Sequence, residues 1–384
     1  MITRSCRADE KRHSCPKDTL TQQIGARVTN PTLKDLGWSP FFATQPDASG
    51  GTDGVPMRIA SVQRNKATGL SEQGDQRLIY PPGLSAGDVA VGDWVMVDPD
   101  THVIRTILDR SSKLSRRAAG IEAKSQLLAA NIDTLFITTS CNEDFNPARI
   151  ERYVVLALDA GVSPVLVLTK ADKAEDTQSY LQQAQEISNK FEAILIINAK
   201  DPDQSDRLRH WCGPGRTVAF VGSSGVGKST LINALTGSEQ STADIREDDA
   251  KGRHTTTARS LHFATGGGMV IDMPGMRELG LHDVAGGIDV LFDDITELAT
   301  QCKFRDCAHI SEPGCAVLAA IKAGTLDEAR VERWRKLRAE DQLNSETMGQ
   351  TRRRAREITR QHKAVQAAQG RFKGKPGGKN KSGK

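Results

Sequence analysis

The chain has 384 residues, of which 38% are hydrophobic and 26% are charged. This length exceeds that of one small module and suits two or three domains with a sizeable buried core. No apolar run reaches the roughly 18 to 20 residues that a membrane-spanning helix needs, and no apolar segment of a secretory signal follows the charged start. We therefore expect a cytoplasmic protein.

The net charge of +4 is unevenly distributed along the chain. Residues 351–384 contain twelve Lys and Arg against one acidic residue, Glu357, so this tail carries +11 and everything before it −7. Such a block of like charge suits a polyanion such as RNA. A solvated, solubilising tail is the alternative interpretation.

The first half of the chain divides into two regions and the start of a third. Residues 1–50 are interpreted as an extension whose one apolar knot lies around Leu36 and Phe42. In residues 51–112 the strand-like segments MRIASV, QRLIY, VAVGDWVMVD and HVIRTIL are separated by turn-rich stretches such as NKATG and SEQGD, which predicts a small antiparallel barrel. Its basic residues either contact phosphates or form a solvated face: Arg58, Arg64, Lys66, Arg77 and Arg105.

From residue 113 to 290 the pattern changes. Short, β-branched apolar runs (IDTLFITT, PVLVLT, FEAILIIN and RTVAFVG) alternate with amphipathic helical stretches. Buried strands that alternate with helices predict an α/β domain with a mostly parallel sheet covered on both faces. A helical segment at 291–345 surrounds a Cys/His cluster, and the basic tail at 346–384 follows it.

A phosphate-binding loop follows the run TVAFV and opens the helix STLINALTG. It fits the pattern G-x-x-x-x-G-K-[ST] in full. Backbone N–H groups of such a loop point at phosphate oxygens, while Lys228 is expected to reach the β- and γ-phosphates and Ser229 to ligate Mg²⁺. The candidate residues are Gly222, Ser223, Ser224, Gly225, Val226, Gly227, Lys228, Ser229 and Thr230.

Three further segments complete the predicted nucleotide site, and two of them indicate that the nucleotide is GTP. Thr169-Lys170-Ala171-Asp172 ends one apolar run, and the Asp172 carboxylate can accept from guanine N1–H and N2–H₂, a pairing that adenine does not offer. Asn198 and Ala199 end the next run and offer a backbone N–H to guanine O6. Downstream, Asp272 of DMPG is expected to hold Mg²⁺ and Gly275 to sense the γ-phosphate. Each segment alone is also compatible with an ordinary turn at the end of a strand.

Three cysteines crowd around one histidine near the C-terminus, in the spacing C-x₄-C-x-H-x₅-C. Three thiolates and an imidazole make a closed tetrahedral zinc set with no open position for catalysis. Buried reduced cysteines are the alternative. The predicted ligands are Cys302, Cys307, His309 and Cys315.

The order of the motifs is circularly permuted, because the guanine motif precedes the phosphate loop. Together with LGWSPFF, VGDWV, GRHTTT, DMPG and the zinc spacing, this order resembles the family of ribosome small subunit-dependent GTPase A over roughly residues 36–345. The resemblance implies an N-terminal OB-fold, a permuted GTPase domain and a helical zinc domain. It also implies GTP hydrolysis late in maturation of the small ribosomal subunit, stimulated by that subunit, with rRNA as a partner of a monomeric protein.

The resemblance also assigns the switch regions. In GRHTTT, Thr256 would close on Mg²⁺ and His254 would position the attacking water, because Met276 stands where many GTPases have a glutamine. Thr169 stands where the family usually has asparagine. Because switch II leads directly into the zinc segment, we expect the nucleotide state to reposition that segment.

Two other functions remain open from the sequence. One is an RNA-binding assembly module that uses GTP only as a conformational ligand with negligible turnover. The other is a P-loop kinase or ATPase, which Asp172 and the lack of an evident acceptor site disfavour.

Overall fold

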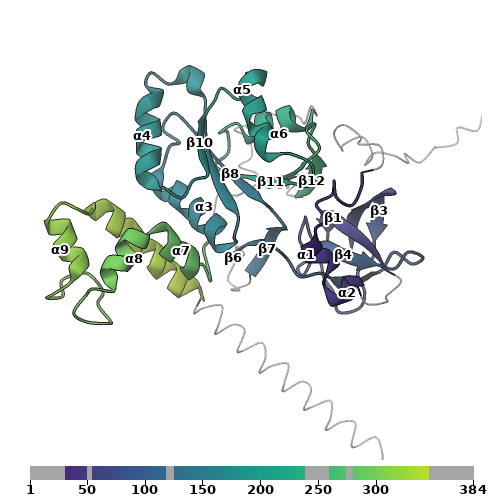
Figure 1. Cartoon of the computed structure of the whole chain (residues 1–384), viewed down its shortest axis with the longest axis horizontal. Helices are drawn as coiled ribbons and strands as arrows, with labels where there is room; N and C mark the ends of the chain where they lie inside the picture. Colours follow the sequence, from purple (N-terminus) through teal and green to yellow (C-terminus); the bar gives the residue numbers. More distant parts are fainter. Residues whose placement is uncertain (1–30, 50–53, 118–124, 238–258, 274–279, 346–384) are drawn as a thin grey trace, which may run out of the picture.

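The computed structural model describes residues 31–49, 54–117, 125–237, 259–273 and 280–345. Figure 1 shows a β-rich part in purple at one end, a layered α/β part in teal in the middle, and a helical part in yellow-green at the other end. Within the described ranges, every helix is too short or too polar to cross a bilayer.

The β-rich part is antiparallel, as its sequence predicts. β1 pairs with β2 and β4, β2 pairs with β3, and β4 pairs with β5. The apolar residues of these strands enclose a small core of their own. The elements of this part are α1 (Pro40–Ala43), α2 (Pro46–Ser49), β1 (Val55–Gln63), β2 (Lys66–Ser71), β3 (Gly74–Leu78), β4 (Trp94–Val97) and β5 (Ile104–Ile107).

One strand of this part differs from the sequence prediction. β2 covers part of the stretch NKATG, which was expected to be a turn because it is polar and contains a glycine. Gly69 serves cross-strand packing instead, since a Cβ there would lie 2.7 Å from Cδ1 of Leu78 on β3. The glycine lets the two strands approach each other closely.

The apolar knot of the N-terminal region packs against the β-rich part. Leu36 and Phe42 are buried, and the ring of Trp38 meets that of Trp94 edge-on at 4.7 Å between centroids. Gly37 has φ 85°, and a Cβ at this position would lie 2.4 Å from Nη1 of Arg58. The turn therefore requires glycine for its conformation and for space.

Arg58 of β1 is buried, so both alternatives for this residue, a phosphate contact and a solvated face, are wrong. Its guanidinium donates to the carbonyl oxygens of Leu36 at 2.5 Å, Asn131 at 2.8 Å and Gly92 at 3.3 Å. Burial lowers its pKa to about 10, so the group stays charged at neutral pH. Arg105, by contrast, forms an ion pair with Asp98 at 2.6 Å on the surface.

The central part is built on a sheet that continues into the β-rich part. Its strands run in the order β10-β9-β8-β11-β13-β12 and then join β1. The first five are parallel, and β12 is antiparallel to β13 and to β1. The strands are β8 (Thr134–Ser140), β9 (Ser163–Thr169), β10 (Ala193–Ile196), β11 (Thr217–Val221), β12 (Ser260–Phe263) and β13 (Met269–Asp272).

Helices cover both faces of this sheet, as predicted. Residues of α3 and α4 belong to the larger apolar core, whereas residues of α6 and η2 belong to a second core around Phe136 and Phe220. A two-stranded hairpin, β6 (Lys113–Arg117) and β7 (Ser125–Ala130), forms a separate sheet. The helices are α3 (Pro147–Asp159), η1 (Ala171–Lys173), α4 (Thr177–Ile187), α5 (Pro202–Asp206), η2 (Arg207–Trp211) and α6 (Lys228–Thr236).

The C-terminal part consists of α7 (Ala285–Leu291), α8 (Asp293–Ala299), α9 (Ala316–Lys322) and helical residues 328–345, here called the C-terminal helix. It packs on α3, where a Cβ at Gly287 of α7 would lie 2.4 Å from the Val155 carbonyl oxygen. Two ion pairs join α3 to the C-terminal helix. Glu151, which is buried, accepts from Arg333 at 2.9 Å, and Arg152 donates to Glu340 at 2.5 Å.

The C-terminal helix also holds the backbone at residues 281–284, where the chain enters the helical part. Leu281 donates its N–H to Glu340 at 3.4 Å, and its carbonyl oxygen accepts from Asn344 at 2.7 Å. The N–H of Val284 donates to Asp341 at 3.0 Å. Residues 281–284 are thus fixed to the last described helix.

Replacing Arg58 with Met is expected to destabilise the protein by about 3 kcal/mol or more, because each buried carbonyl left without a donor costs roughly 1–3 kcal/mol. Thermal unfolding of the Arg58→Met variant measures this loss of stability. Arg64→Ala, at an exposed position just beyond the end of β1, is the control and should leave the melting temperature unchanged. Equal melting temperatures for the two variants would contradict the assigned role of Arg58.

Candidate nucleotide site and cysteine–histidine cluster

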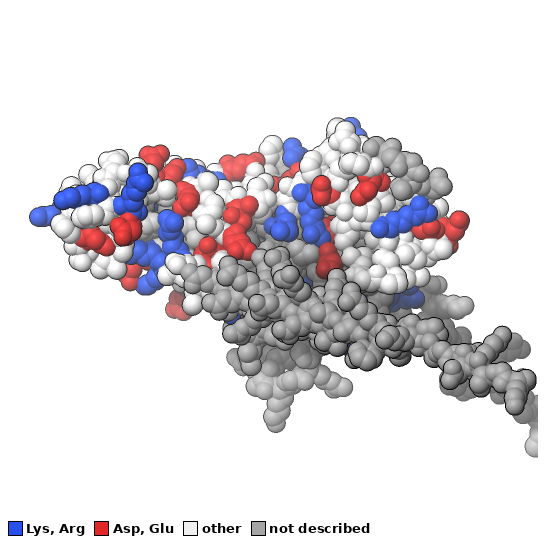
Figure 2. Space-filling view, turned by 90° about the horizontal axis from the view of Figure 1, so that it is seen from below, with Lys and Arg blue, Asp and Glu red and all other residues white. Residues whose placement is uncertain are grey.

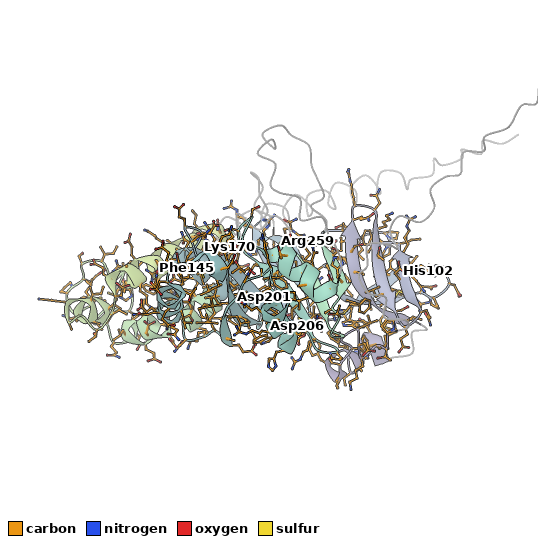
Figure 3. All side chains as sticks on the ribbon, turned by 90° about the horizontal axis from the view of Figure 1, so that it is seen from above. His102, Phe145, Lys170, Asp201, Asp206 and Arg259 are labelled. Carbon is orange, nitrogen blue, oxygen red and sulfur yellow. The ribbon has the colours of Figure 1, made fainter. Side chains whose placement is uncertain are left out.

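The parallel strands bring the predicted nucleotide motifs to one edge of the sheet. The segments after β9, β10 and β11 all leave from carboxyl ends, where ligands bind in open α/β sheets. Figure 3 shows Lys170 on the central part of the molecule. The described residues of the predicted site lie at this edge: Thr169, Lys170, Asp172, Asn198, Ala199, residues 222–230 and Asp272. His254, Thr256 and Gly275 lie outside the described residues.

The phosphate loop has the conformation that its glycines allow. Gly222, Gly225 and Gly227 have φ of 144°, 77° and 97°. A Cβ at Gly222 would lie 2.1 Å from the Thr138 carbonyl oxygen of β8, so no other residue fits there. The Lys228 ammonium folds back over the loop and donates to the carbonyl oxygens of Gly222 at 2.9 Å and Ser223 at 2.5 Å.

Asp272 ends β13, the neighbour of the strand that precedes the phosphate loop. Burial raises the pKa of this carboxyl group, and the charge of Lys228 opposes the rise. The two side chains therefore interact electrostatically across the loop. A carboxylate beside the phosphate-loop lysine is in a position to help hold a divalent cation.

Thr169 joins the guanine motif to the phosphate loop. Its hydroxyl is buried and lies 2.6 Å from the carbonyl oxygen of Val226 and 3.1 Å from that of Thr139. The next residue, Lys170, has φ 57° and lies 3.9 Å from Asp144. Asp172 is exposed in η1, where its carboxylate is free to meet a base.

The third loop of the site follows β10 and is held by a residue that the sequence did not single out. The N–H of Asn198 donates to the side chain of Gln204 at 2.8 Å. A Cβ on Gly227 would lie 3.6 Å from that of Ala199, so this loop borders the phosphate loop. Gln204 carries no motif, and its role depends on a helical turn, α5, that brings it back towards β10.

A second residue missed at the sequence level is Arg149 in the first turn of α3. Its Nη1 donates to the hydroxyl of Ser223 in the phosphate loop. The pattern N-P-A-R at the start of a helix after β8 gave no hint of this contact. Only the pairing of β8 with β11 in the sheet brings the two segments together.

The four predicted metal ligands lie together, with one ligand atom of each within 4.8 Å of the others. Nδ1 of His309 lies 3.5 Å from Sγ of Cys302 and 3.4 Å from Sγ of Cys315, and these two sulfurs are 3.8 Å apart. Tetrahedral zinc with Zn–S bonds of about 2.3 Å places two sulfurs about 3.8 Å apart. The donor set and its spacing therefore fit zinc.

Neighbouring groups orient these ligands. The N–H groups of Ala316 and Leu318, at the start of α9, donate to Sγ of Cys302 and Cys315 at 3.4 Å each. Arg335 of the C-terminal helix donates to the carbonyl oxygen of His309. Burial, together with the charge of Arg335, lowers the pKa of His309, so its ring is neutral, the form that binds metals.

Comparison with known proteins identifies the chain's relatives. The Small ribosomal subunit biogenesis GTPase RsgA of Mesorhizobium japonicum is 55% identical over 322 residues, which cover 83% of this chain and 92% of that protein. The chain belongs to the RsgA GTPase family. The family model described as RsgA GTPase matches residues 107–282, and one described as ABC transporter matches residues 206–366, a span that also contains the phosphate loop.

Other RsgA relatives and solved structures agree with this assignment. The Small ribosomal subunit biogenesis GTPase RsgA 2 of Vibrio parahaemolyticus is 45% identical over 86% of this chain and 91% of its own. The crystal structure of YjeQ from Thermotoga maritima has a TM-score of 0.54 at 26% identity and covers 74% of this chain and 97% of that one. YloQ, described as a circularly permuted GTPase, has a TM-score of 0.51 at 24% identity over 76% and 96%. The permuted order of motifs read from the sequence agrees with that fold.

Replacing Thr169 with Val is expected to weaken guanine nucleotide binding about fivefold, the equivalent of roughly 1 kcal/mol for one lost hydrogen bond. The variant keeps the shape of the side chain and leaves the Val226 carbonyl without its donor. Titration with a fluorescent GDP analogue measures the affinity. Thr169→Ser keeps the hydroxyl and should bind as the parent does, so equal affinities of the two variants would disprove the link.

Proposed function

We propose that this member of the RsgA family binds GTP with Mg²⁺ and hydrolyses it to GDP and phosphate in the biogenesis of the small ribosomal subunit. One observation carries the proposal. The phosphate loop and the Thr169–Asp172 segment, which lie in permuted order along the chain, meet at one sheet edge and are joined by the Thr169 hydroxyl. The phosphate loop, which binds the triphosphate, and the Asp172 carboxylate, which selects guanine, therefore belong to one site.

Each part of the site has a distinct task. Backbone N–H groups of residues 223–228 bind phosphate oxygens, and the Lys228 ammonium leaves its loop carbonyls to neutralise the β- and γ-phosphates. Ser229, Thr256 and Asp272 hold Mg²⁺, which draws charge from the phosphate oxygens when it is bound. The Asp172 carboxylate accepts from guanine N1–H and N2–H₂, while Lys170, Asn198 and Ala199 complete the base site.

Hydrolysis needs a group that orients water, and we assign this role to His254. Met276, after DMPG, has no hydrogen-bonding group that can orient water, and Gly275 supplies a backbone N–H towards the γ-phosphate. None of the described arginines is assigned as an arginine finger that completes the site, so we expect slow turnover alone and faster turnover with the small subunit bound.

The partner surface includes rRNA, and the C-terminal part supports this assignment. Beside the cysteine–histidine cluster lies a pocket lined by Phe304, Ile310 and Trp334 together with Arg305, Arg335 and Arg338. The exposed ring of Phe304 beside these arginines suits single-stranded RNA, which stacks on rings and binds cations through its phosphates, whereas Trp334 is buried. Figure 2 shows Lys and Arg side chains at the end of the molecule that holds α9, with Asp and Glu between them. The protein acts as a cytoplasmic monomer in this proposal.

Cys302, Cys307, His309 and Cys315 hold one structural zinc ion. The closed set leaves no position for a substrate, so the ion stabilises the C-terminal part rather than taking part in hydrolysis. Because α8 and α9 bury few residues of their own, the cluster holds together a segment with little core.

GTP hydrolysis measured with and without small ribosomal subunits tests the activity. Phosphate release should be specific for GTP over ATP and should rise when subunits are added. A rate that stays negligible in both conditions would favour a binding module that uses GTP only as a conformational ligand.

Asp172→Asn tests the base site. The amide presents a donor to guanine N1–H, so GTP affinity should fall at least about tenfold while xanthosine triphosphate binding rises. Competition between the two nucleotides measures the switch. Asp176→Asn is the matched control, because this residue caps α4 four positions later and Asn caps a helix equally well. GTP binding that is unchanged in Asp172→Asn would overturn the assignment of the base.

Zinc removal tests the cluster. The purified protein should contain one zinc per chain, and Cys307→Ser should lose most of it and unfold at a lower temperature. Cys141→Ala removes a buried thiol outside the cluster and should keep the metal. Equal metal content in the two variants would contradict the predicted site.

A further inference from the structure

Arg149 stands at the junction of α3 and the phosphate loop. Its backbone N–H donates to the side chain of Asn146, the N-cap of α3, at 3.0 Å. Its side chain reaches the phosphate loop that follows β11, where Nη1 donates to the Ser223 hydroxyl. Arg149 and Ser223 are 74 residues apart in the sequence, so the fold and not the local chain creates the contact.

The sheet fixes both ends of this contact. β8 and β11 are parallel neighbours with Ile137 opposite Val221, so the loop after β8 and the phosphate loop leave the sheet side by side. The same turn of α3 is anchored on its other side. Glu151 pairs with Arg333 at 2.9 Å, and Arg152 pairs with Glu340 at 2.5 Å. The base of the Arg149 side chain therefore has a fixed position relative to the loop.

The charge of Arg149 is not neutralised within the described part of the chain. No described carboxylate forms an ion pair with it, and its one side-chain hydrogen bond is to Ser223. The guanidinium is charged at any physiological pH and has five donors in a planar fork, of which the Ser223 hydroxyl uses one. Further donors remain for an anion.

Arg149 faces the part of the loop where the Lys228 ammonium rests before it moves to the β- and γ-phosphates. The lysine of a phosphate loop serves the β- and γ-phosphates, and here its ammonium lies 2.5 Å from the Ser223 carbonyl oxygen. Ser223 thus accepts from Lys228 through its backbone and from Arg149 through its side chain. Two cations therefore meet at Ser223, and we place this residue at the β/γ end because the lysine that serves these phosphates rests there.

We propose that Arg149 is a positioning residue that acts through Ser223, holding the phosphate loop and placing a second positive charge at its β/γ end. This role makes the site favour GTP over GDP, because the third phosphate adds negative charge at that end. The inference rests on the proposed function, since it requires the loop to bind a guanine nucleotide.

The experiment compares Arg149→Ala, Arg149→Lys and Ser223→Ala with the parent protein and with Arg77→Ala, an exposed arginine on β3, the edge strand at the other end of the sheet order. Dissociation constants are measured for GDP and for a non-hydrolysable GTP analogue, and single-turnover hydrolysis is followed without subunits. Arg149→Ala should weaken the GTP analogue about tenfold and GDP about twofold or less, in line with a charge interaction near the third phosphate. Its hydrolysis rate should also fall.

The remaining variants separate charge from structure. Arg149→Lys should restore most of the preference for the GTP analogue, because a cation alone carries the electrostatic part. Ser223→Ala should weaken binding partly, and the double variant with Arg149→Ala should be no worse than Arg149→Ala alone, as expected for two residues that act as a unit. Should Arg149→Ala fold poorly, the Lys and Ser223 variants carry the test.

Equal losses for GDP and the GTP analogue, or no loss for either, would overturn the inference while leaving the proposed function intact. Failure of the parent protein to bind GTP would instead overturn the proposed function and this inference with it. Lys228→Ala is the reference for complete loss of nucleotide binding, because it should abolish binding of both GDP and the GTP analogue.

Discussion

The guanidinium of Arg58 is the interaction on which the arrangement of the β-rich and central parts depends. It donates to carbonyl oxygens of three segments that are distant in the sequence: the N-terminal turn at Leu36, the turn at Gly92 and the end of β7 at Asn131. It also lies 3.6 Å from Sδ of Met269, the first residue of β13. Because β13 ends at Asp272, one buried cation links the β-rich part to the strand that carries a predicted magnesium ligand.

Backbone pairing continues this link. β1 pairs with β12, and β12 pairs with β13, so one sheet runs from the β-rich part to the nucleotide site. A surface that docks on a ribosomal partner through the β-rich part would therefore be mechanically continuous with the strand beside the phosphate loop. Within the described strands, backbone pairing joins the β-rich part to the strand beside the phosphate loop.

Motifs that depend on a local run of residues were predictable from the sequence. The phosphate loop, the TKAD segment and the C-x₄-C-x-H-x₅-C spacing each carry their chemistry within a few positions, and the helical and strand periods between them predicted the α/β sheet. The structure brings the cluster ligands together as expected, with the sulfurs of Cys302 and Cys315 3.8 Å apart. His254 and Thr256 remain predictions from resemblance.

Residues whose roles arise from distant contacts were not predictable. Arg58 looked like an exposed strand residue because period-two alternation does not reveal that three carbonyl groups surround it. The start of β2 was predicted to be a turn from the stretch NKATG. Gly69 instead allows a close approach to Leu78, a contact that is visible only once the two strands are paired. Gln204 and Arg149 belong to the same class, since their partners come from other loops of the sheet edge.

The crowding of contacts on the first turns of α3 limits how this region can change in length. Within four consecutive positions, side chains of residues 149, 151 and 152 face the phosphate loop and the C-terminal helix. Each added residue rotates the rest of an α-helix by about 100° and advances it by about 1.5 Å. A single insertion between Arg149 and Glu151 would turn one set of partners away while leaving the other in place. The length of this part of α3 is therefore constrained by contacts on two sides of the helix.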